Sequence, residues 1–348
     1  MSNFIKIYNK EKLLEFYSHR PNETKIGESI QVIEYPDEWM NALRQSSAKF
    51  VILGIPEDIG VRANLGRPGA YSAFNAALKS FLSMQNNFYL QAKEILLLGE
   101  VVVNDLMETS KKLNPKNAQD LLQLRQLVEE LDKRVFEIIK SIVQSNKVPI
   151  VIGGGHNNAY PIIKAVSQCL SKKINVINCD AHSDLRPMEG RHSGNGFRYA
   201  LEEGYINHYH ILGLHEQYTT EAIYQYIRKN NVTFYTYEDI FIREKLSFRE
   251  ALNNSIFLVK NTDCGIELDI DAITNVPSSA RTSSGISPID ARKYIYFFSN
   301  QLNSLYLHLA EAAPETAHLR ADYKTGKLLA YLICDFIKGI NDKNNEIA

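Results

Sequence analysis

The sequence lacks the features that would assign it to a membrane, a nucleic acid or an oxidising compartment. No apolar run approaches the roughly 20 residues that a membrane-spanning helix needs. The formal net charge is only −1, so no basic surface for nucleic acid is indicated. The four cysteines have no CxxC spacing, and the N-terminal residues have no signal-peptide core. We therefore expect a cytoplasmic protein with reduced thiols.

Short apolar segments and amphipathic helical patterns alternate along the 348 residues. Strands are predicted at 50–55, 94–98, 148–152, 174–177, 209–213, 232–236, 266–270 and 304–310. Helices are predicted at 124–142, 160–170, 220–229, 289–302 and 325–338, the last ending at Gly339. About eight strands alternating with helices predict an α/β sheet covered on both faces. We interpret 1–348 as one domain, with 1–47 as an N-terminal extension packed on it.

The most informative stretch is 174–187, which reads INVINCDAHSDLRP. An apolar strand pattern is followed by Asp180, His182 and Asp184 at alternate positions. If the backbone stays extended there, all three side chains leave on one side. Two carboxylates and an imidazole suit Mn²⁺, and less strongly Zn²⁺, Fe²⁺ or Co²⁺. The alternative is a polar loop entry with a capping Asp and a hydrogen-bonded His.

Two further stretches place similar side chains after strands. His156 follows three glycines that let the backbone turn sharply at the end of 148–152. Asp269 and Asp271 stand two positions apart in ELDID, at the end of another apolar strand. Taken alone, the first could be a tight turn with a polar cap, and the second an exposed strand edge. Acidic side chains are costly when buried without a partner, so a cation is the interpretation that we favour.

Six candidate ligands thus follow three predicted strands: His156, Asp180, His182, Asp184, Asp269 and Asp271. The ends of strands are where open α/β sheets place their sites. Four carboxylates clustered without a cation would repel one another. Six ligands exceed the needs of one four-coordinate ion and suit two metals about 3.5–4 Å apart.

Read together, GGGH, DAHSD and DID resemble the three metal motifs of the ureohydrolases, the arginase/agmatinase/formimidoylglutamase superfamily. Weaker matches are the loop GVRANLGRPGA and the segment EAAP near the end, so the resemblance runs over about 50–336. It implies a three-layer α/β/α fold, a centre of two Mn²⁺ ions and hydrolysis of a C–N bond in an amidine or guanidine. Oligomers are common in that superfamily, which leaves a homo-oligomer open.

One position departs from the superfamily pattern and two from the arginases. Glu267 stands where the third motif usually has Ser, which we expect to alter the shape of the substrate pocket. Phe197 takes a position that is His in arginases, and Arg186 one that is Asn. Both of these resemble the formimidoylglutamases. If Phe197 removes a protonating group, His215 could replace it, although a structural role for His215 is the alternative.

The resemblance also implies roles for side chains around the metals. Asp184 would accept the proton of the attacking hydroxide and pass it to the leaving nitrogen. Glu311 would pair with the cationic amidinium, or be only a solvated carboxylate. Ser193 and Asn195 would bind the polar end of the substrate, or serve only as loop formers. Arg186 would hold a substrate carboxylate, or pair with a structural one.

The sequence therefore favours an enzyme of histidine metabolism that converts N-formimidoyl-glutamate to glutamate and formamide. Arg186 suits a diacid, because a guanidinium can hold a carboxylate through two parallel hydrogen bonds. The alternatives are a guanidino hydrolase that releases urea, such as an arginase, an agmatinase or a guanidino-acid hydrolase, and a non-catalytic relative that binds metal.

Overall fold

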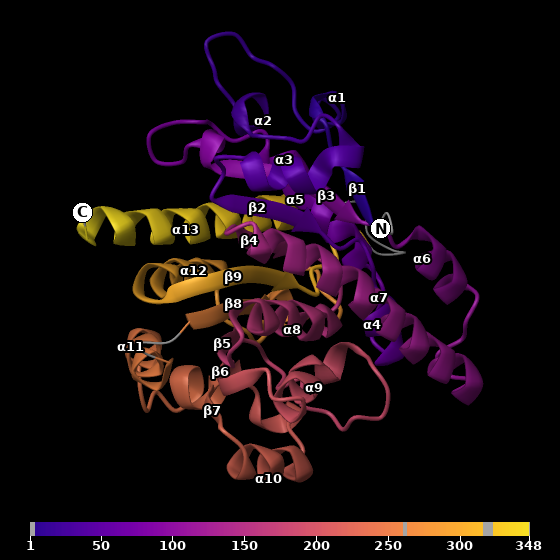
Figure 1. The fold of residues 1–348 in the computed structure, drawn as a ribbon. Coiled ribbons are helices and arrows are strands. Elements are labelled where there is room, and N and C mark those ends of the chain that lie inside the picture. Colours follow the sequence, from indigo (N-terminus) through magenta and orange to yellow (C-terminus); the bar gives the residue numbers. More distant parts are fainter. Residues whose placement is uncertain (1–3, 260–262, 316–322, 348) are drawn as a thin grey trace.

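A computed structural model describes residues 4–259, 263–315 and 323–347 (Figure 1). The strands of these residues are β1 (Ile5–Ile7), β2 (Phe50–Gly54), β3 (Ile95–Val101), β4 (Val148–Ile152), β5 (Ile174–Cys179), β6 (Ile206–Leu214), β7 (Val232–Thr236), β8 (Asp263–Asp269) and β9 (Asn303–Ala310). They form one sheet in the order β1-β3-β2-β4-β9-β8-β5-β6-β7. β1 pairs antiparallel with β3, and the other pairings are parallel. The predicted, mainly parallel α/β sheet is thus confirmed, with nine strands where about eight were expected.

Helices cover both faces of this sheet, which makes three layers (Figure 1). The α-helices of the described residues are α1 (Lys10–Leu13), α2 (Ile26–Ser29), α3 (Trp39–Gln45), α4 (Ile59–Ala63), α5 (Ala73–Phe81), α6 (Asn104–Lys111), α7 (Ala118–Gln144), α8 (Ala159–Leu170), α9 (Gly196–Glu202), α10 (Glu221–Lys229), α11 (Phe248–Val259), α12 (Pro288–Gln301) and α13 (Tyr323–Ile347). α4, α6, α8 and α9 join α7 in one layer, and α5, α12 and α11 join α13 in the other.

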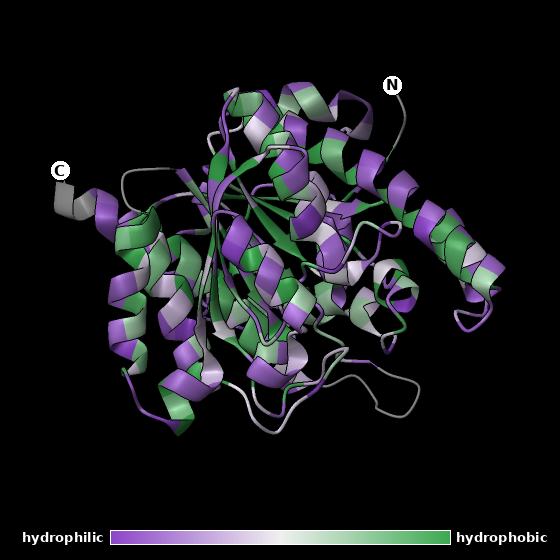
Figure 2. Cartoon of the chain, turned by 90° about the horizontal axis from the view of Figure 1, so that it is seen from below, coloured by the Kyte–Doolittle hydropathy of each residue, from purple (hydrophilic) through white to green (hydrophobic). Residues whose placement is uncertain are grey.

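The apolar core is divided in two by the sheet. In β5, Ile177 and Cys179 belong to the core under α12 and α13, whereas Ile174 and Val176 belong to the core under α7 and α8. Every residue of β5 is buried, as expected for a central parallel strand with helices on both faces. Figure 2 shows the same arrangement, with hydrophobic residues on the sheet and hydrophilic ones on the outer faces of the helices.

One strand was not predicted, and two local expectations are wrong. Residues 5–7 form β1, and a strand of three residues is too short to show a predictive sequence pattern. Residues 56–74, which include the segment GVRANLGRPGA and were expected as a loop, contain α4, the 3-10 turn η2 (Ala70–Ser72) and the first two residues of α5. α13 continues through Gly339 to Ile347, because this glycine serves packing rather than a helix end. A Cβ atom on Gly339 would lie 1.9 Å from the Ser299 Oγ of α12, so glycine lets the two helices approach.

The division into domains stays a prediction. The expected N-terminal extension supplies β1, which hydrogen-bonds along β3 and so joins the main sheet. Residues 1–3 of that extension lie outside the described residues. Among the described helices, none combines the length and the apolar character that crossing a membrane requires.

The strand order decides where the candidate site lies. β4, β9, β8 and β5 are consecutive neighbours and run parallel, so their carboxyl ends meet at one edge of the sheet. His156 follows β4, Asp180 follows β5, Asp269 ends β8, and Glu311 follows β9. Chain segments distant in sequence therefore bring polar side chains to one place, at the edge where parallel sheets bind ligands.

Candidate metal centre

A glycine turn brings His156 to the edge of the sheet. Gly153 has φ +88° and Gly154 has φ +74°, a left-handed conformation that glycine adopts without strain. The backbone N–H of Gly155 donates to the buried carboxylate of Glu57 at 2.9 Å, which anchors the turn. The 3-10 turn η4 (His156–Asn158) then begins with the His156 side chain fully buried.

The loop after β5 brings its three candidate ligands together by folding, and not by strand alternation as we expected. β5 ends at Cys179, and Asp184 has φ +50°, a left-handed conformation that is unusual for a residue other than glycine. The backbone N–H of His182 donates to Asp180 Oδ1 at 2.7 Å, which closes the loop. Strained backbone of this kind is found at functional sites, where the surrounding fold holds it in place.

Asp271 also leaves the strand geometry that we expected. It lies in the 3-10 turn η8 (Ile270–Ala272), and its backbone N–H donates to Asp269 Oδ1 at 2.8 Å. The two carboxylates consequently point to different parts of the site instead of sharing one strand face.

The six candidate ligands form two overlapping groups. In the first, which we call the inner group, His156 Nδ1 lies 3.3 Å from Asp180 Oδ2, 3.0 Å from Asp184 Oδ2 and 3.1 Å from Asp269 Oδ2. The members of the inner group are His156, Asp180, Asp184 and Asp269. Their ligand atoms lie within 4.8 Å of one another, a spacing at which they could hold one metal ion.

The second, outer group is made of Asp180, His182 and Asp271. His182 Nδ1 lies 3.6 Å from Asp180 Oδ1 and 3.3 Å from Asp271 Oδ2. The two groups share Asp180, whose Oδ2 faces the inner group and whose Oδ1 faces the outer one. One carboxylate shared between two donor sets suits a pair of neighbouring divalent ions.

The electrostatics of the site favour a cation. Burial lowers the pKa of His156, but the carboxylates of Asp180, Asp184 and Asp269 raise it well above its usual value. Burial, together with the negative charge of Asp180, raises the pKa of Asp184 to about 6. Asp271 Oδ1 is buried and has no hydrogen-bond partner among the described residues. Oxygen-rich donors with excess negative charge and an unpartnered oxygen fit divalent ions.

A pocket of about 230 Å³ opens onto both groups. Glu311 lies in its wall with φ +64°, and its Oε1 accepts a hydrogen bond from the backbone N–H of His156 at 2.8 Å. Its Oε2 is buried without a hydrogen-bond partner among the described residues. Burial raises the pKa of Glu311 to about 8. This geometry differs from the solvated carboxylate that was the alternative, because the side chain is only 3% exposed.

Arg186 and Ser193 also line the pocket. The Arg186 side chain is 47% exposed, and it donates to Asn64 Oδ1 at 3.1 Å and to Glu189 Oε1 at 3.0 Å. Ser193 Oγ accepts from Asn64 Nδ2 at 3.3 Å. Arg186 therefore has a carboxylate partner within the protein, at a rim where solvent weakens the pair.

Asn195 does not reach the pocket. It is buried, its Oδ1 accepts from Arg191 Nη1 at 2.8 Å, and its Nδ2 donates to the carbonyl of Gly190 at 2.8 Å. With both ends of the amide engaged inside the loop, the structure favours the loop-forming alternative for Asn195.

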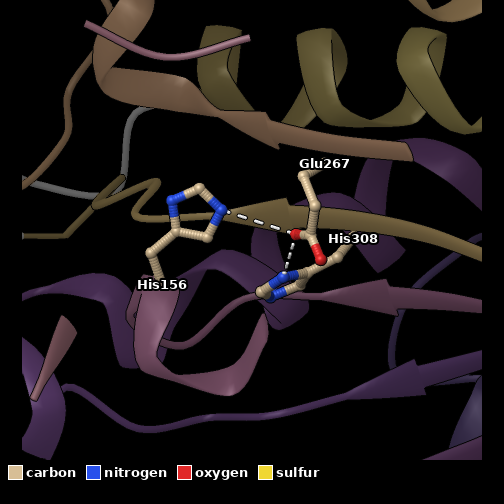
Figure 3. A group of neighbouring side chains, drawn as sticks. All are labelled: His156, Glu267 and His308. Carbon is tan, nitrogen blue, oxygen red and sulfur yellow. Dashed lines mark hydrogen bonds and ion pairs between the residues drawn. The ribbon is translucent and has the colours of Figure 1, made fainter. Parts of the chain in front are cut away.

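Glu267, which was expected to alter the shape of the pocket, does not line it, and neither does Phe197. The Phe197 ring is buried, with its centroid 5.0 Å from that of His156 in an edge-on contact, and it stacks on Tyr209. Glu267 is also fully buried and lies behind His156, beside His308 (Figure 3). The expectation that Glu267 changes the pocket wall is therefore wrong, since its carboxylate faces Nε2 of His156 and does not line the pocket.

His215 lies apart from the pocket wall. Its ring stacks on those of Tyr218 and Tyr237, with centroids 5.2 and 4.7 Å away. Tyr218 in turn stacks on His182 and lines the pocket. The arrangement favours the structural role for His215, which supports the ring that contacts a candidate ligand.

Sequence reasoning missed Asn64, Tyr218 and Ser279 as residues of the pocket wall. Asn64 lies within the motif GVRANLGRPGA, which could have pointed to it. Tyr218 ends the 3-10 turn η6 (Glu216–Tyr218) and Ser279 lies in an irregular segment, and since neither belongs to a motif, only the folded structure brings them to the site.

The fold and the site define a class: three-layer α/β proteins with two adjoining groups of carboxylate and histidine ligands at the carboxyl edge of a parallel sheet. The family model described as "Arginase family" matches residues 48–338. The chain belongs to the arginase family.

Named relatives agree with this assignment. The formimidoylglutamase of Geobacillus sp. (strain WCH70) is 28% identical over 275 residues, which cover 78% of each chain. The solved formimidoylglutamase of Bacillus subtilis has a TM-score of 0.73 at 19% identity, covering 93% of this chain and 94% of its own. The formiminoglutamase of Trypanosoma cruzi, solved with Mn²⁺, has a TM-score of 0.69 at 20% identity, covering 91% and 98%. The structural likenesses confirm the predicted arginase-like fold.

Proposed function

We propose that the protein is a binuclear manganese hydrolase that cleaves the C–N bond of a linear amidine, converting N-formimidoyl-glutamate and water to glutamate and formamide. Membership of the arginase family and relatives named formimidoylglutamase support a metal-dependent hydrolase of this class. The Mn²⁺ in the Trypanosoma cruzi relative supports manganese as the metal. A cytoplasmic location, a role in histidine metabolism and a homo-oligomer belong to the same proposal.

The observation that carries this function is the shared position of Asp180 between the inner and outer groups. Its two oxygens serve two donor sets, and both sets face the pocket that Glu311 and Arg186 line. Under this proposal His156, Asp180, Asp184 and Asp269 hold one ion, and Asp180, His182 and Asp271 hold the other. Divalent ions held there would lower the pKa of a coordinated water and stabilise developing negative charge.

The residues of the chain would orient the substrate and move its protons. Glu311 Oε2, which is buried and has no hydrogen-bond partner in the part of the chain that the structure describes, can accept hydrogen bonds from the amidinium N–H groups. That contact turns the amidine carbon toward the ligand groups and favours the cationic, more electrophilic substrate. Asp184, which lines the same pocket, would take the proton of the attacking water and pass it to the leaving nitrogen.

The pocket rim would recognise the carboxylates of the glutamate portion. Arg186 is half exposed there, and a substrate carboxylate can replace Glu189 as its partner. Asn64 and Ser193 offer neutral donors beside it. A diacid suits this rim better than agmatine does, because an amine-bearing chain would meet the guanidinium of Arg186.

A product assay with the Mn²⁺-loaded protein tests the proposal. We expect formamide from N-formimidoyl-glutamate at a higher kcat/KM than urea from arginine, agmatine or guanidino acids. Faster urea release would contradict the substrate and indicate a guanidino hydrolase. Bound metal without hydrolysis of any amidine or guanidine would indicate the non-catalytic relative.

A further inference from the structure

A fully buried polar group lies behind His156, on the side away from the pocket. Glu267 of β8 faces His308 of the neighbouring strand β9, and these two residues are paired in register. Glu267 Oε2 lies 2.7 Å from His308 Nδ1, and Glu267 Oε1 accepts from the Tyr306 hydroxyl at 2.8 Å. Figure 3 shows the Glu267 carboxylate between the rings of His156 and His308. Both carboxylate oxygens are thus held in place by residues of one strand.

The two ring nitrogens of His156 face different surroundings. Nδ1 faces the carboxylates of the inner group, whereas Nε2 lies 3.4 Å from Glu267 Oε2. Nε2 is buried, and it makes no hydrogen bond among the described residues, so the Glu267 carboxylate is a charged contact of this nitrogen and not its hydrogen-bond acceptor. A neutral imidazole carries one N–H and one lone pair, on different nitrogens. A carboxylate at Nε2 favours the N–H there and leaves the Nδ1 lone pair for a cation.

The cluster of His156, Glu267 and His308 could itself be read as a third metal site. The geometry argues against that. Two ligands about 2.1 Å from one tetrahedral ion lie about 3.4 Å apart. The contact between Glu267 Oε2 and His308 Nδ1 is 2.7 Å, which is the length of a direct, charge-assisted hydrogen bond. Glu267 therefore acts through the ring of His156 and not as a ligand of its own ion.

The outer group has a different environment. The His182 side chain is 32% exposed, and its ring stacks on that of Tyr218 at a centroid distance of 5.1 Å. His156, in contrast, is completely buried and has Glu267 behind it. Water and side-chain motion can compete for His182 but not for His156. The two groups are therefore unequal in how firmly the protein holds their histidines.

We propose that Glu267 is a positioning residue that fixes the tautomer and orientation of His156, and thereby makes the inner group the tighter of the two metal sites. This inference rests on the metal centre proposed above. Carboxylates that hold a ligating histidine in this way contribute about 10–100-fold in metal affinity. Glu267 stands where the third ureohydrolase motif usually has Ser, so this chain has a charged partner for its histidine at that position.

Calorimetric titration of the metal-free protein with Mn²⁺ tests this inference without an activity assay. For the wild type we expect two steps, the tighter at the inner group. Glu267→Gln keeps the shape but removes the charge, and should weaken the tighter step about 10–100-fold while leaving the weaker step unchanged. A general loss of packing would weaken both steps, so selectivity for one step distinguishes positioning from structural support.

Two further variants complete the design. Tyr294→Phe removes a hydrogen bond to the backbone carbonyl of Glu267 and keeps its carboxylate, so both steps should match the wild type. Tyr306→Phe releases one carboxylate oxygen without removing charge, and should weaken the tighter step less than Glu267→Gln does. If Glu267→Gln fails to fold, Tyr306→Phe provides the test of the role of Glu267 in its place.

The outcomes separate the two proposals. An unchanged tighter step in Glu267→Gln, or in Tyr306→Phe if only that variant folds, would overturn the role of Glu267 and leave the metal centre standing. A wild type that binds no Mn²⁺ would overturn both the metal centre and this inference.

Discussion

The carboxylate of Glu311 accepts a hydrogen bond from the backbone N–H of His156 at 2.8 Å, across 155 positions of sequence. The contact joins the segment after β9 to the turn after β4, and β4 and β9 are adjacent strands in the sheet. Glu311 Oε2 has no hydrogen-bond partner among residues 4–259, 263–315 and 323–347, while the same histidine points its Nδ1 toward the other members of the inner group. Under the proposed function, substrate recognition and metal binding would therefore share one backbone segment.

The shared position of Asp180 predicts how metal content responds to substitution. Asp180→Asn should reduce bound Mn²⁺ toward zero ions per chain, because both groups lose a charged donor. Asp271 belongs only to the outer group. Asp271→Asn should therefore leave the inner group intact and retain about one ion per chain. Metal analysis after dialysis measures the difference.

Asp105→Asn is the matched control for those two variants. Asp105 pairs with Arg134 on the surface and has a 61% exposed side chain, so this variant should retain the wild-type metal content. Equal metal loss from Asp180→Asn and Asp271→Asn would contradict the shared role of Asp180.

The meeting of the three ligand segments could be predicted from sequence, because parallel strands bring their carboxyl ends to one edge. Apolar runs at 148–152 and 232–236 also defined β4 and β7 with their correct bounds. The left-handed turn at Asp184 could not be predicted, since it depends on contacts made by the whole loop. The roles of Gly339 and Glu267 could not be predicted either. Gly339 is set by its contact with α12 and Glu267 by its contact with β9, and neither contact leaves a local sequence pattern.

His215 is predicted to be dispensable for proton transfer. Its ring is stacked between those of Tyr218 and Tyr237, away from the pocket wall. His215→Phe keeps an aromatic ring in the stack, so kcat and its pH profile should stay at wild-type values. His215→Ala removes that support and should lower the melting temperature. A loss of kcat in His215→Phe without loss of metal would contradict this prediction.

The raised pKa of Glu311 predicts how the stability of the metal-free protein depends on pH. The folded-state pKa of about 8 lies above the ordinary value of 4.5, because the carboxylate is buried. The folded protein therefore holds a proton in that window which the unfolded chain has released. Stability should fall as pH rises from about 4.5 toward 8, and it should be fully retained below that window.

Glu311→Gln removes this titration, so the melting temperature of the variant should fall less steeply over the same pH range. Thermal melts of chelator-treated protein measure the slope, and metal analysis of the same samples is the control that no ion remains. A slope as steep as that of the wild type would show that another group is responsible.

Arg186 is predicted to set the preference for a diacid. Its guanidinium already lies 3.0 Å from Glu189 Oε1 at the pocket rim, so it is positioned to exchange this partner for a substrate carboxylate. Arg186→Ala should raise KM for N-formimidoyl-glutamate by about 10–100-fold, since a hydrogen bond to a charged group contributes about 1.5–3 kcal/mol. The change in kcat should be small, because Arg186 contacts the distal end of the substrate and not the reacting carbon.

Arg125→Ala is the matched control for Arg186→Ala. Arg125 binds the same carboxylate, with Nη2 3.3 Å from Glu189 Oε1, but it does not line the pocket. Its loss frees Glu189 without removing the guanidinium at the rim, so KM should stay within about twofold of the wild type if direct charge-assisted contact is what matters. A similar rise in KM in both variants would mean that the loop around Glu189, and not the charge of Arg186, shapes the rim. An unchanged KM in Arg186→Ala would place the substrate carboxylates elsewhere, with Asn64 and Ser193 as the remaining donors on that side of the pocket.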